Sequence, residues 1–542
     1  MNETSIIRKV IAASSVGTMI EWYDFYIFGM LAKTISTQFF PDGNSTAALL
    51  STLAIFAAGF IVRPFGALVF GRLGDLIGRK HTFLLTLLLM GGSTFLIGLV
   101  PGYKSIGIAA PIIVLLLRLV QGLALGGEYG GAATYVAEHS PAHKRGFYTS
   151  WIQTTATLGL FVALGIIMAV KLNMSDTAFN AEWGGWRYPF WISILLVAVS
   201  VYIRLKMSES PLFSKLKEEG KTSVNPLKES FSHKANFKMV LVALFGAVMG
   251  QGVIWYTGQF YAQNFLETKC NIEFEQSRTI MLWAIAFATP FFVFFGWLSD
   301  RIGRKWIMLA GMLLGVLTYR PIFNEFLKDS DIRESLTLLP NYKPGEKTRG
   351  IDFFSSSNYQ KKMIAFIDAG NSMKTVIVKQ DTVKNENKIL LNYYNLYAFN
   401  HGLKFKEIRL DTLFLRGSPY KDEISFGTST KFTDKVLPQN TYWKFIGLVF
   451  LLILFVTMVY GPIAAFLVEI FPTKIRYTSM SLPYHIGNGV FGGLVPFIGL
   501  LLTTSFPEDA LVGLWYPIGI AALCFIIGAV YLSNKIDENV DD

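Results

Sequence analysis

Hydrophobic residues along this chain gather into long runs of about 20 residues, and a run of this length crosses a bilayer as one helix. Twelve such runs are predicted, with polar or glycine-containing connections between them. They cover residues 10–36, 47–70, 82–101, 109–138, 146–171, 187–206, 239–266, 278–299, 305–322, 443–469, 477–504 and 511–533. The pattern predicts an all-α polytopic membrane protein with twelve transmembrane helices.

Composition and charge agree with this prediction. The 542 residues are 52% hydrophobic and 16% charged, whereas soluble domains average about 25% charged residues. Lysine and arginine collect in short connections at residues 79–80, 144–145, 301–305 and 474–476. Such residues favour the cytoplasmic side of a membrane, so we expect both termini and the basic segment 207–238 to be cytoplasmic. The net charge of +11 therefore indicates membrane orientation, and no nucleic-acid partner is expected.

The chain repeats two of its own motifs. Gly71-Arg-Leu-Gly-Asp-Leu-Ile-Gly-Arg-Lys80 recurs as Gly296-Trp-Leu-Ser-Asp-Arg-Ile-Gly-Arg-Lys305, at an offset of 225 residues. A glutamate followed by an arginine seven positions later occurs at 138 and again at 469, an offset of 331 residues. Repeats of this kind predict two six-helix halves. Because the offsets differ by 106 residues, an insertion of about that length must lie between residues 305 and 469.

The predicted insertion is polar and spans residues 323–442. Residues 374–380 and 388–394 have the pattern of strands, and residues 363–368 that of a strand or a short helix. We expect a small mixed α/β unit between helices 9 and 10, with a disordered loop as the alternative. The domains are then a first bundle (1–206), a cytoplasmic linker (207–238), helices 7–9 (239–322), the insertion (323–442), and helices 10–12 with a short tail (443–542).

Further motifs resemble a known family. They are Glu21-Trp-Tyr-Asp-Phe-Tyr26, Arg63-Pro-Phe-Gly66, Arg118-Leu-Val-Gln-Gly122 and Glu469-Ile-Phe-Pro-Thr-Lys-Ile-Arg-Tyr477. Together with the repeated loops, they resemble the metabolite:proton symporters of the major facilitator superfamily, and the first half is most similar to α-ketoglutarate permeases. The resemblance covers residues 6–320 and 443–533. It implies two six-helix bundles around a central cavity, and transport of small metabolites such as organic acids, proline or betaine.

The acids Glu21 and Asp24 lie near the middle of the first predicted helix, three residues apart and on one face. Ionisable groups inside a membrane are costly and mark a pathway or an ion pair. Two neighbouring buried carboxylates repel each other, which suits groups that take up and release protons. The alternative is that they pair with Arg63 or Arg118 for packing alone. We expect proton coupling here, without deciding which acid dominates.

The fourth predicted helix carries Arg118, Gln121 and Glu128 on one side, with Arg118 near mid-membrane. A permanent cation at this depth needs an anion, which can be Glu128, an acid of the first helix or a substrate carboxylate. A static ion pair is the alternative. We expect Arg118, Gln121 and Arg63 to bind substrate and Glu128 to join in proton coupling.

Two later helices also carry polar or aromatic residues inside apolar runs. Trp255, Tyr256 and Gln259 belong to the seventh helix, and we expect Gln259 to face the cavity. Tyr484 and His485 belong to the eleventh. Aromatic residues are also common at membrane interfaces, and a histidine in such a run is more often a packing residue. These five residues complete the predicted substrate site.

By the same resemblance, the repeated loop charges form ion-pair clusters that open and close the cytoplasmic side. Positive-inside orientation would explain their arginines but not their repeated acids. The predicted gating residues are Asp75, Arg79, Glu138, Arg145, Asp300, Arg304, Glu469 and Arg476.

Taken together, these features predict proton-coupled uptake of a small organic acid, such as a di- or tricarboxylate or an α-keto acid, across a bacterial inner membrane. A proline or betaine symporter is one alternative, and a sensor acting through the outer insertion is another. No catalytic constellation, metal site or cofactor is expected; the proton gradient supplies the energy. The expected partners are the organic anion, protons and the bilayer, while a partner of the insertion stays open.

Overall fold

The computed structural model describes residues 3–41, 44–77, 79–127, 133, 136–137, 140–205, 234–333, 362–367, 373–385, 388–398, 402–416, 423–471 and 476–534. Within these ranges most side chains of the strands are not described, nor are those near residues 3–14 and 74–83. The chain divides into two compact units. The first comprises Met1–Ala262, Met281–Pro321 and Leu448–Asp542, and the second comprises Gln263–Ile280 and Ile322–Gly447.

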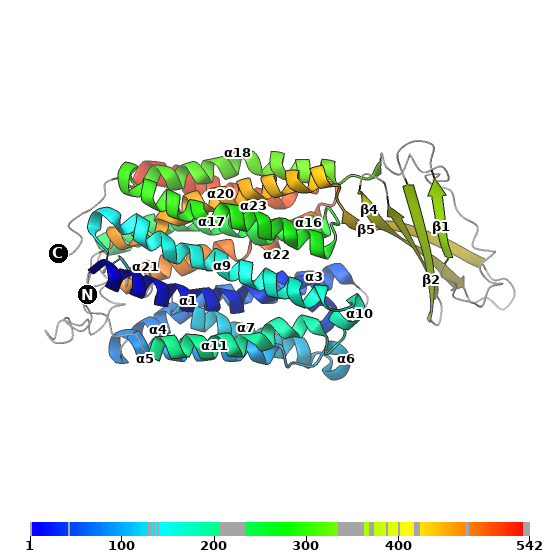
Figure 1. Cartoon of the computed structure of the whole chain (residues 1–542), viewed down its shortest axis with the longest axis horizontal. Coiled ribbons are helices and arrows are strands. Elements are labelled where there is room, and N and C mark those ends of the chain that lie inside the picture. Colours follow the sequence, from blue (N-terminus) through cyan, green and yellow to red (C-terminus); the bar gives the residue numbers. More distant parts are fainter. Residues whose placement is uncertain are drawn as a thin grey trace. The chain divides into compact units, whose positions relative to one another are not determined.

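The described helices belong wholly or partly to the first unit, where they run side by side (Figure 1). Those before the 206–233 gap are α1 (Glu3–Met30), α2 (Ala32–Phe39), α3 (Ser45–Ile61), α4 (Arg63–Ile77), α5 (Arg79–Ile97), α6 (Tyr103–Ile106), α7 (Ala109–Gly126), η1 (Ala142–Lys144), α9 (Arg145–Leu172), α10 (Asp176–Phe179), η2 (Gly185–Arg187) and α11 (Tyr188–Leu205). Those after it are α14 (Lys234–Ala243), η3 (Leu244–Val248), α15 (Met249–Tyr256), η4 (Thr257–Tyr261), α16 (Ala262–Thr268), α17 (Phe274–Ile302), α18 (Lys305–Asp329), α20 (Gln439–Ile470), α21 (Arg476–His485), η6 (Ile486–Gly492), α22 (Val495–Ser505), η7 (Val512–Leu514) and α23 (Trp515–Tyr531).

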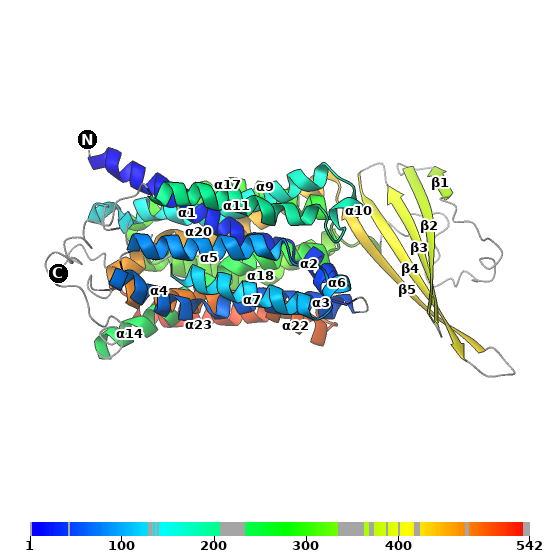
Figure 2. The same ribbon diagram turned by 90° about the horizontal axis from the view of Figure 1, so that it is seen from below.

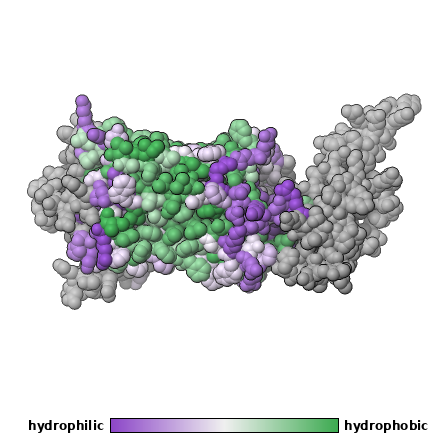
Figure 3. Space-filling view, turned by 90° about the horizontal axis from the view of Figure 1, so that it is seen from above, coloured by the Kyte–Doolittle hydropathy of each residue, from purple (hydrophilic) through white to green (hydrophobic). Residues whose placement is uncertain are grey.

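Each of the twelve predicted spans coincides, over its described part, with a helix or a series of joined helices. In the described part of the chain, nine helical segments are long and apolar enough to cross a membrane. Large apolar side chains such as Leu195, Leu317 and Val530 are more than half exposed on the outer faces of these helices. On the face shown in Figure 3, hydrophobic side chains form a broad band, bordered on both sides by hydrophilic ones. The fold class is therefore a multi-pass helical membrane protein, as predicted.

Among the described residues, three segments wind as π-helix instead of α-helix. They are η3 and η4 within the seventh predicted span and η6 within the eleventh. A π-helical turn shifts the residues that follow it around the helix axis, and such turns are frequent at functional sites. Segment η6 contains Gly487, Gly489 and Gly492, so close packing is possible there without side-chain clashes.

The second unit contains a five-stranded sheet, whose strands lie side by side in Figure 2. Its strands are β1 (Lys362–Ile367), β2 (Met373–Asn385), β3 (Lys388–Ala398), β4 (Lys404–Arg416) and β5 (Glu423–Val436). They are all antiparallel and lie in sequence order. The register pairs Ile377 with Leu396 and Leu396 with Lys406, and it shifts between Lys404 and Lys406. The strands predicted at 374–380 and 388–394 are confirmed.

Two details of the predicted insertion are now decided. Residues 363–368, expected as a strand or a short helix, fall almost entirely within β1, which pairs with β2. The flanking helices are also longer than the apolar runs: α18 continues to Asp329, and α20 begins at Gln439. Lys444 links the two extended helix ends, because its ammonium group pairs with Glu325 at 2.8 Å and Asp329 at 2.6 Å.

Candidate functional site

The acids of α1 are both buried, with Glu21 2% and Asp24 0% exposed. Neither carboxyl oxygen of Asp24 has a hydrogen-bond partner among the residues that the structure describes. The hydroxyl of Ser193 on α11 faces this carboxyl group at a geometry short of a hydrogen bond. Within the described residues, no cation forms an ion pair with Asp24 to balance a negative charge.

Arg118 on α7 does not pair with Asp24. Its guanidinium group donates to the side chain of Gln121 and, at 3.5 Å, to the backbone oxygen of Phe25. Gln121 in turn donates to the backbone oxygen of Asp24 at 3.0 Å and to the hydroxyl of Thr94 at 2.7 Å. The structure thus brings Arg118, Gln121 and the backbone of Asp24 together, with Gln121 as the link.

The guanidinium group of Arg118 is fully buried among aromatic rings. Its central carbon lies 4.2 Å from the ring centroid of Phe25, 4.7 Å from that of Phe28 and 5.1 Å from that of Phe56. Nε and Nη2 have no hydrogen-bond partner among the described residues. Ring faces attract cations, but they do not supply the hydrogen-bond acceptors that a guanidinium fork requires.

Arg63, at the start of α4, has a similar environment. Its central carbon lies 4.1 Å from the ring centroid of Phe60 and 4.4 Å from that of Phe25, the same ring that Arg118 contacts. Tyr256 of α15 faces this guanidinium group. Nε and Nη2 of Arg63 also have no hydrogen-bond partner within the described residues. Two buried cations therefore share one aromatic cluster.

Residues of the seventh and tenth spans extend this cluster. Trp255 stacks on Tyr26 with 6.5 Å between centroids and lies 4.5 Å from the ring of Tyr460. Gln259 is fully buried in the π-helical segment η4, and neither end of its amide has a partner within the part of the chain that the structure describes. An unsatisfied buried amide is costly, which singles out Gln259 as a ligand-binding candidate.

The eleventh span adds a polar group. The hydroxyls of Tyr484 and Tyr460 are 2.6 Å apart, and both ring nitrogens of His485 lack a partner among the described residues. Asn488 donates to Gln251 at 2.8 Å and joins η6 to α15. The sequence interpretation missed Gln251 and Tyr460. The signal for Gln251 was available, since it is a polar residue inside an apolar run.

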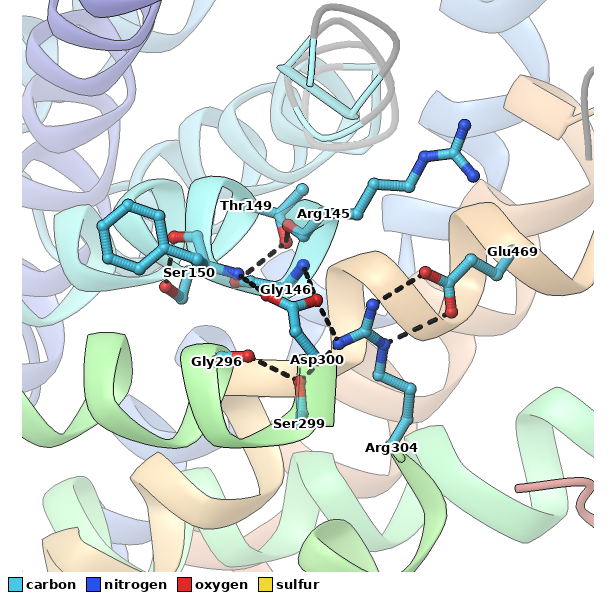
Figure 4. A network of polar contacts seen from close by, with 10 residues as sticks. Arg145, Gly146, Thr149, Ser150, Gly296, Ser299, Asp300, Arg304 and Glu469 are labelled. Carbon is cyan, nitrogen blue, oxygen red and sulfur yellow. Dashed lines mark hydrogen bonds and ion pairs between the residues drawn. The ribbon is translucent and has the colours of Figure 1, made fainter. Parts of the chain in front are cut away.

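A second cluster lies where α17 ends and α9 begins (Figure 4). The carboxylate of Asp300 accepts hydrogen bonds from the backbone amides of Gly146 and Phe147, both at 2.8 Å. These amides belong to the first turn of α9, where the helix dipole favours an anion. A residue of the second half thus caps a helix of the first half.

Arg304 connects this cap to α20. It donates to Asp300 at 2.7 Å, to Ser299 at 2.7 Å and to Glu469 at 2.8 Å. All three charged side chains are at most 6% exposed. The amide of Asn534, beyond the end of α23, donates to Ile302 at 3.2 Å, so the end of the described chain lies beside this cluster.

Glycines allow the two halves to meet here. A methyl group at Gly146 would collide with the backbone oxygen of Gly296, and one at Gly296 would collide with Ser150. The same principle applies within the first half, where Gly122 and Gly126 of α7 face the backbone oxygens of Gly59 and Arg63. These two glycines are four positions apart, a spacing that lets helix backbones approach closely.

The other predicted gating and coupling residues stand as follows. Arg145 is buried, but its side chain points away from Asp300 and Arg304 in Figure 4. Those outside the described residues or side chains are Glu128, Glu138, Asp75, Arg79 and Arg476. Among the described residues, no group of three or more His, Cys, Asp or Glu is placed to hold a metal ion.

Comparisons with known proteins agree with this architecture. Residues 9–224 match the family model described as "Sugar (and other) transporter". The chain is 38% identical to the inner membrane metabolite transport protein YhjE of Escherichia coli, over 59% of this chain and 73% of that one. It is 36% identical to the alpha-ketoglutarate permease of the same organism, over 58% and 70%. A proline/betaine transporter of Escherichia coli is 34% identical over 57% of this chain, less than two thirds of that protein's length.

Two longer matches complete the comparison. A putative metabolite transport protein of Haemophilus influenzae is 30% identical over 99% of this chain and 96% of that one. The xylose transporter XylE from Escherichia coli superposes with a TM-score of 0.60 at 15% identity, covering 98% of this chain and 99% of that one, which shows the fold alone. The chain is a transporter rather than an enzyme, and it belongs to the sugar and metabolite transporter family of the major facilitator superfamily.

Proposed function

We propose that this transporter takes up a small organic anion together with protons. The observation that carries the proposal is Arg118, fully buried with two guanidinium nitrogens unsatisfied among the described residues. Burying a cation is costly unless an anion accompanies it. A carboxylate matches the fork of an arginine with two parallel hydrogen bonds. In this proposal the substrate carboxylate binds Arg118, and the amide of Gln259 contacts another polar group of the same molecule.

Asp24 is the proposed proton carrier. An ionised carboxylate buried without a counter-charge is far more costly than the neutral acid, and Asp24 has no cation partner in the described chain. Gln121 joins Arg118, the proposed substrate-binding residue, to the backbone of Asp24 through two hydrogen bonds. Substrate binding at Arg118 and proton binding at Asp24 can therefore influence each other through Gln121. Glu21, also buried, is the second candidate for the proton.

The Asp300 cluster is the proposed gate. It holds α9 against α17 and α20 by buried charge-assisted hydrogen bonds, which a transporter must break to open this end. We propose that this end faces the cytoplasm of a bacterium with both termini, and that the insertion, reached after an odd number of crossings, is on the outer face. The basic turns of the sequence support this orientation. The name of the relative YhjE, an inner membrane metabolite transport protein, supports the choice of membrane.

A zwitterion such as proline or betaine is the second candidate substrate, because related transporters carry those names. It would also place a carboxylate on Arg118. The second buried cation, Arg63, shares the ring of Phe25 and favours a net anion over a molecule that carries its own ammonium group.

External pH in lightly buffered, de-energised cells tests the proposal. Adding α-ketoglutarate, other organic acids or betaine should alkalinise the medium for one class only. Arg118→Gln should abolish labelled uptake, whereas Asp24→Asn should abolish the pH change. Arg301→Gln, an exposed arginine on α17, is the matched control and should behave as wild type. Uptake without any pH change would refute proton coupling, and wild-type uptake by Arg118→Gln would refute the substrate site.

A further inference from the structure

In the second unit, the last strand of the sheet is joined to the turn between α16 and α17. The backbone amide of Lys435 donates to Asn271 at 2.9 Å, and the amide of Glu273 donates to Lys435 at 2.9 Å. Ile272 and Lys435 form an isolated parallel bridge. The end of β5 is thus hydrogen-bonded to the helix turn as if to another strand.

Side chains reinforce this junction. The ammonium group of Lys435 is buried and donates to the backbone oxygen of Ser330, just beyond α18, at 2.7 Å. The side-chain amide of Gln276 on α17 receives a hydrogen bond from the backbone of Leu437 at 2.7 Å and donates one back at 3.1 Å. The side chains of Lys435 and Gln276 therefore connect the end of β5 and the residue that follows it with the ends of α18 and α17.

The helix ends of this unit are also connected to one another. Glu267 of α16 binds the guanidinium group of Arg278 on α17, and both side chains are buried. Between α18 and α20, Phe326 packs on Phe445 with 4.9 Å between ring centroids. Together with the ion pairs of Lys444, these contacts give each of the four helix ends at least one neighbour within the unit.

We propose that the insertion acts as a staple: β5 fastens the ends of α16, α17, α18 and α20 into one body. The α16 end directly continues η4, the segment that carries Gln259. With the staple closed, this end of the seventh span moves only together with its neighbours during transport. This role of the insertion is separate from the choice of substrate and coupling ion.

Cys270, in the stapled turn, is a natural reporter. It is fully buried, and burial raises the pKa of its thiol to about 12. Because the thiolate is the reactive form, Cys270 should react very slowly with N-ethylmaleimide at neutral pH while the staple is closed. The other cysteine, Cys524, is removed from the signal by a Cys524→Ser background.

The experiment compares maleimide labelling of Cys270 in the full chain with and without Lys435→Ala. Losing a hydrogen bond from a charged donor should speed labelling about tenfold or more, and this opening outweighs the loss of the Lys435 charge, which lowers the pKa of the Cys270 thiol. Lys406→Ala is the matched control, since Lys406 is a half-exposed lysine of β4 that pairs loosely with Asp434 at 3.7 Å. Gln276→Ala, which opens a different link, is the second variant and should also speed labelling. Initial transport rates should change in both staple variants and not in the control.

Wild-type labelling in both Lys435→Ala and Gln276→Ala would overturn the staple. Faster labelling with unchanged transport rates would overturn its role in the transport cycle. The labelling result is independent of proton coupling and of Arg118, because the labelling readout needs no substrate.

Discussion

Replacing Asp300 by asparagine should open the proposed gate. The carboxylate accepts two backbone hydrogen bonds at the start of α9 and one from Arg304. An asparagine keeps one acceptor oxygen and presents an NH2 group at the other position, so one amide of α9 or the guanidinium group faces a donor. The negative charge at the helix terminus is lost as well.

The expected size of the effect follows from these contacts. Losing one charge-assisted hydrogen bond costs about 1.5–3 kcal/mol, and losing the anion at a partly buried helix terminus adds about 1 kcal/mol. Arg304 keeps Glu469, so the loss is smaller than for a cation left with no partner. If these contacts exist only in the closed state, a total of about 3 kcal/mol shifts the equilibrium towards the open gate roughly 100-fold.

Accessibility of a cysteine at position 150 measures this shift. Ser150 is buried against Gly296 within the gate, so Ser150→Cys should be protected while the gate is closed. Adding Asp300→Asn should speed its labelling by a membrane-impermeant maleimide applied to the gate side of inverted vesicles. Asp176→Asn is the control, because Asp176 is 84% exposed in its pair with Lys171. Unchanged protection in Asp300→Asn would refute the gate.

Three further predictions follow. Arg118→Lys keeps the charge but loses the planar fork, so uptake should persist with a KM raised at least tenfold, whereas Arg118→Gln should show none. Gly126→Ala should destabilise the protein by about 1–3 kcal/mol and so lower its melting temperature, because the added methyl group would meet a backbone oxygen of α4. Gly92→Ala is the control and should leave the melting temperature unchanged, because a methyl group there has nothing within 4 Å. Glu182 accepts hydrogen bonds from Ser105 and the backbone of Gly102, which lower the pKa of its carboxyl below the ordinary 4.5. Wild type should therefore have a higher free energy of unfolding than Glu182→Gln at pH 7, and this difference should disappear as the pH falls through that lowered pKa. A difference that grows in acid would contradict the prediction.

Several features could be predicted from the residues alone because their causes are local. Runs of about 20 apolar residues suffice to form spanning helices, since every backbone hydrogen bond closes within the helix. The strands at 374–380 and 388–394 were visible as short β-type runs, but β4 and β5 were missed among polar residues. Their pairing, as in Leu410 with Ser429, is made by hydrogen bonds between two neighbouring strands, which the pattern of each strand taken alone does not reveal.

The candidate site shows the same division. Helical periodicity predicted that Glu21 and Asp24 share a face and that Arg118 and Gln121 lie together. Only the packing of α1, α5, α7 and α11 decided that Arg118 binds Gln121 and leaves the carboxyl group of Asp24 beside Ser193. Likewise, the sequence marked Asp300 as a gate residue, but its partners are backbone amides of α9, which no side-chain pattern reveals.

The sequence by itself therefore determined the number of spans, the position of the insertion and which residues carry charge inside the membrane, because length, hydropathy and helical period act over a few turns. The tertiary structure decided which charges meet, which remain without a partner in the described chain, and how β5 is fastened to the helix ends. These outcomes depend on contacts between segments more than a hundred residues apart, such as Lys435 with Ser330, and such contacts form only when the whole chain has packed.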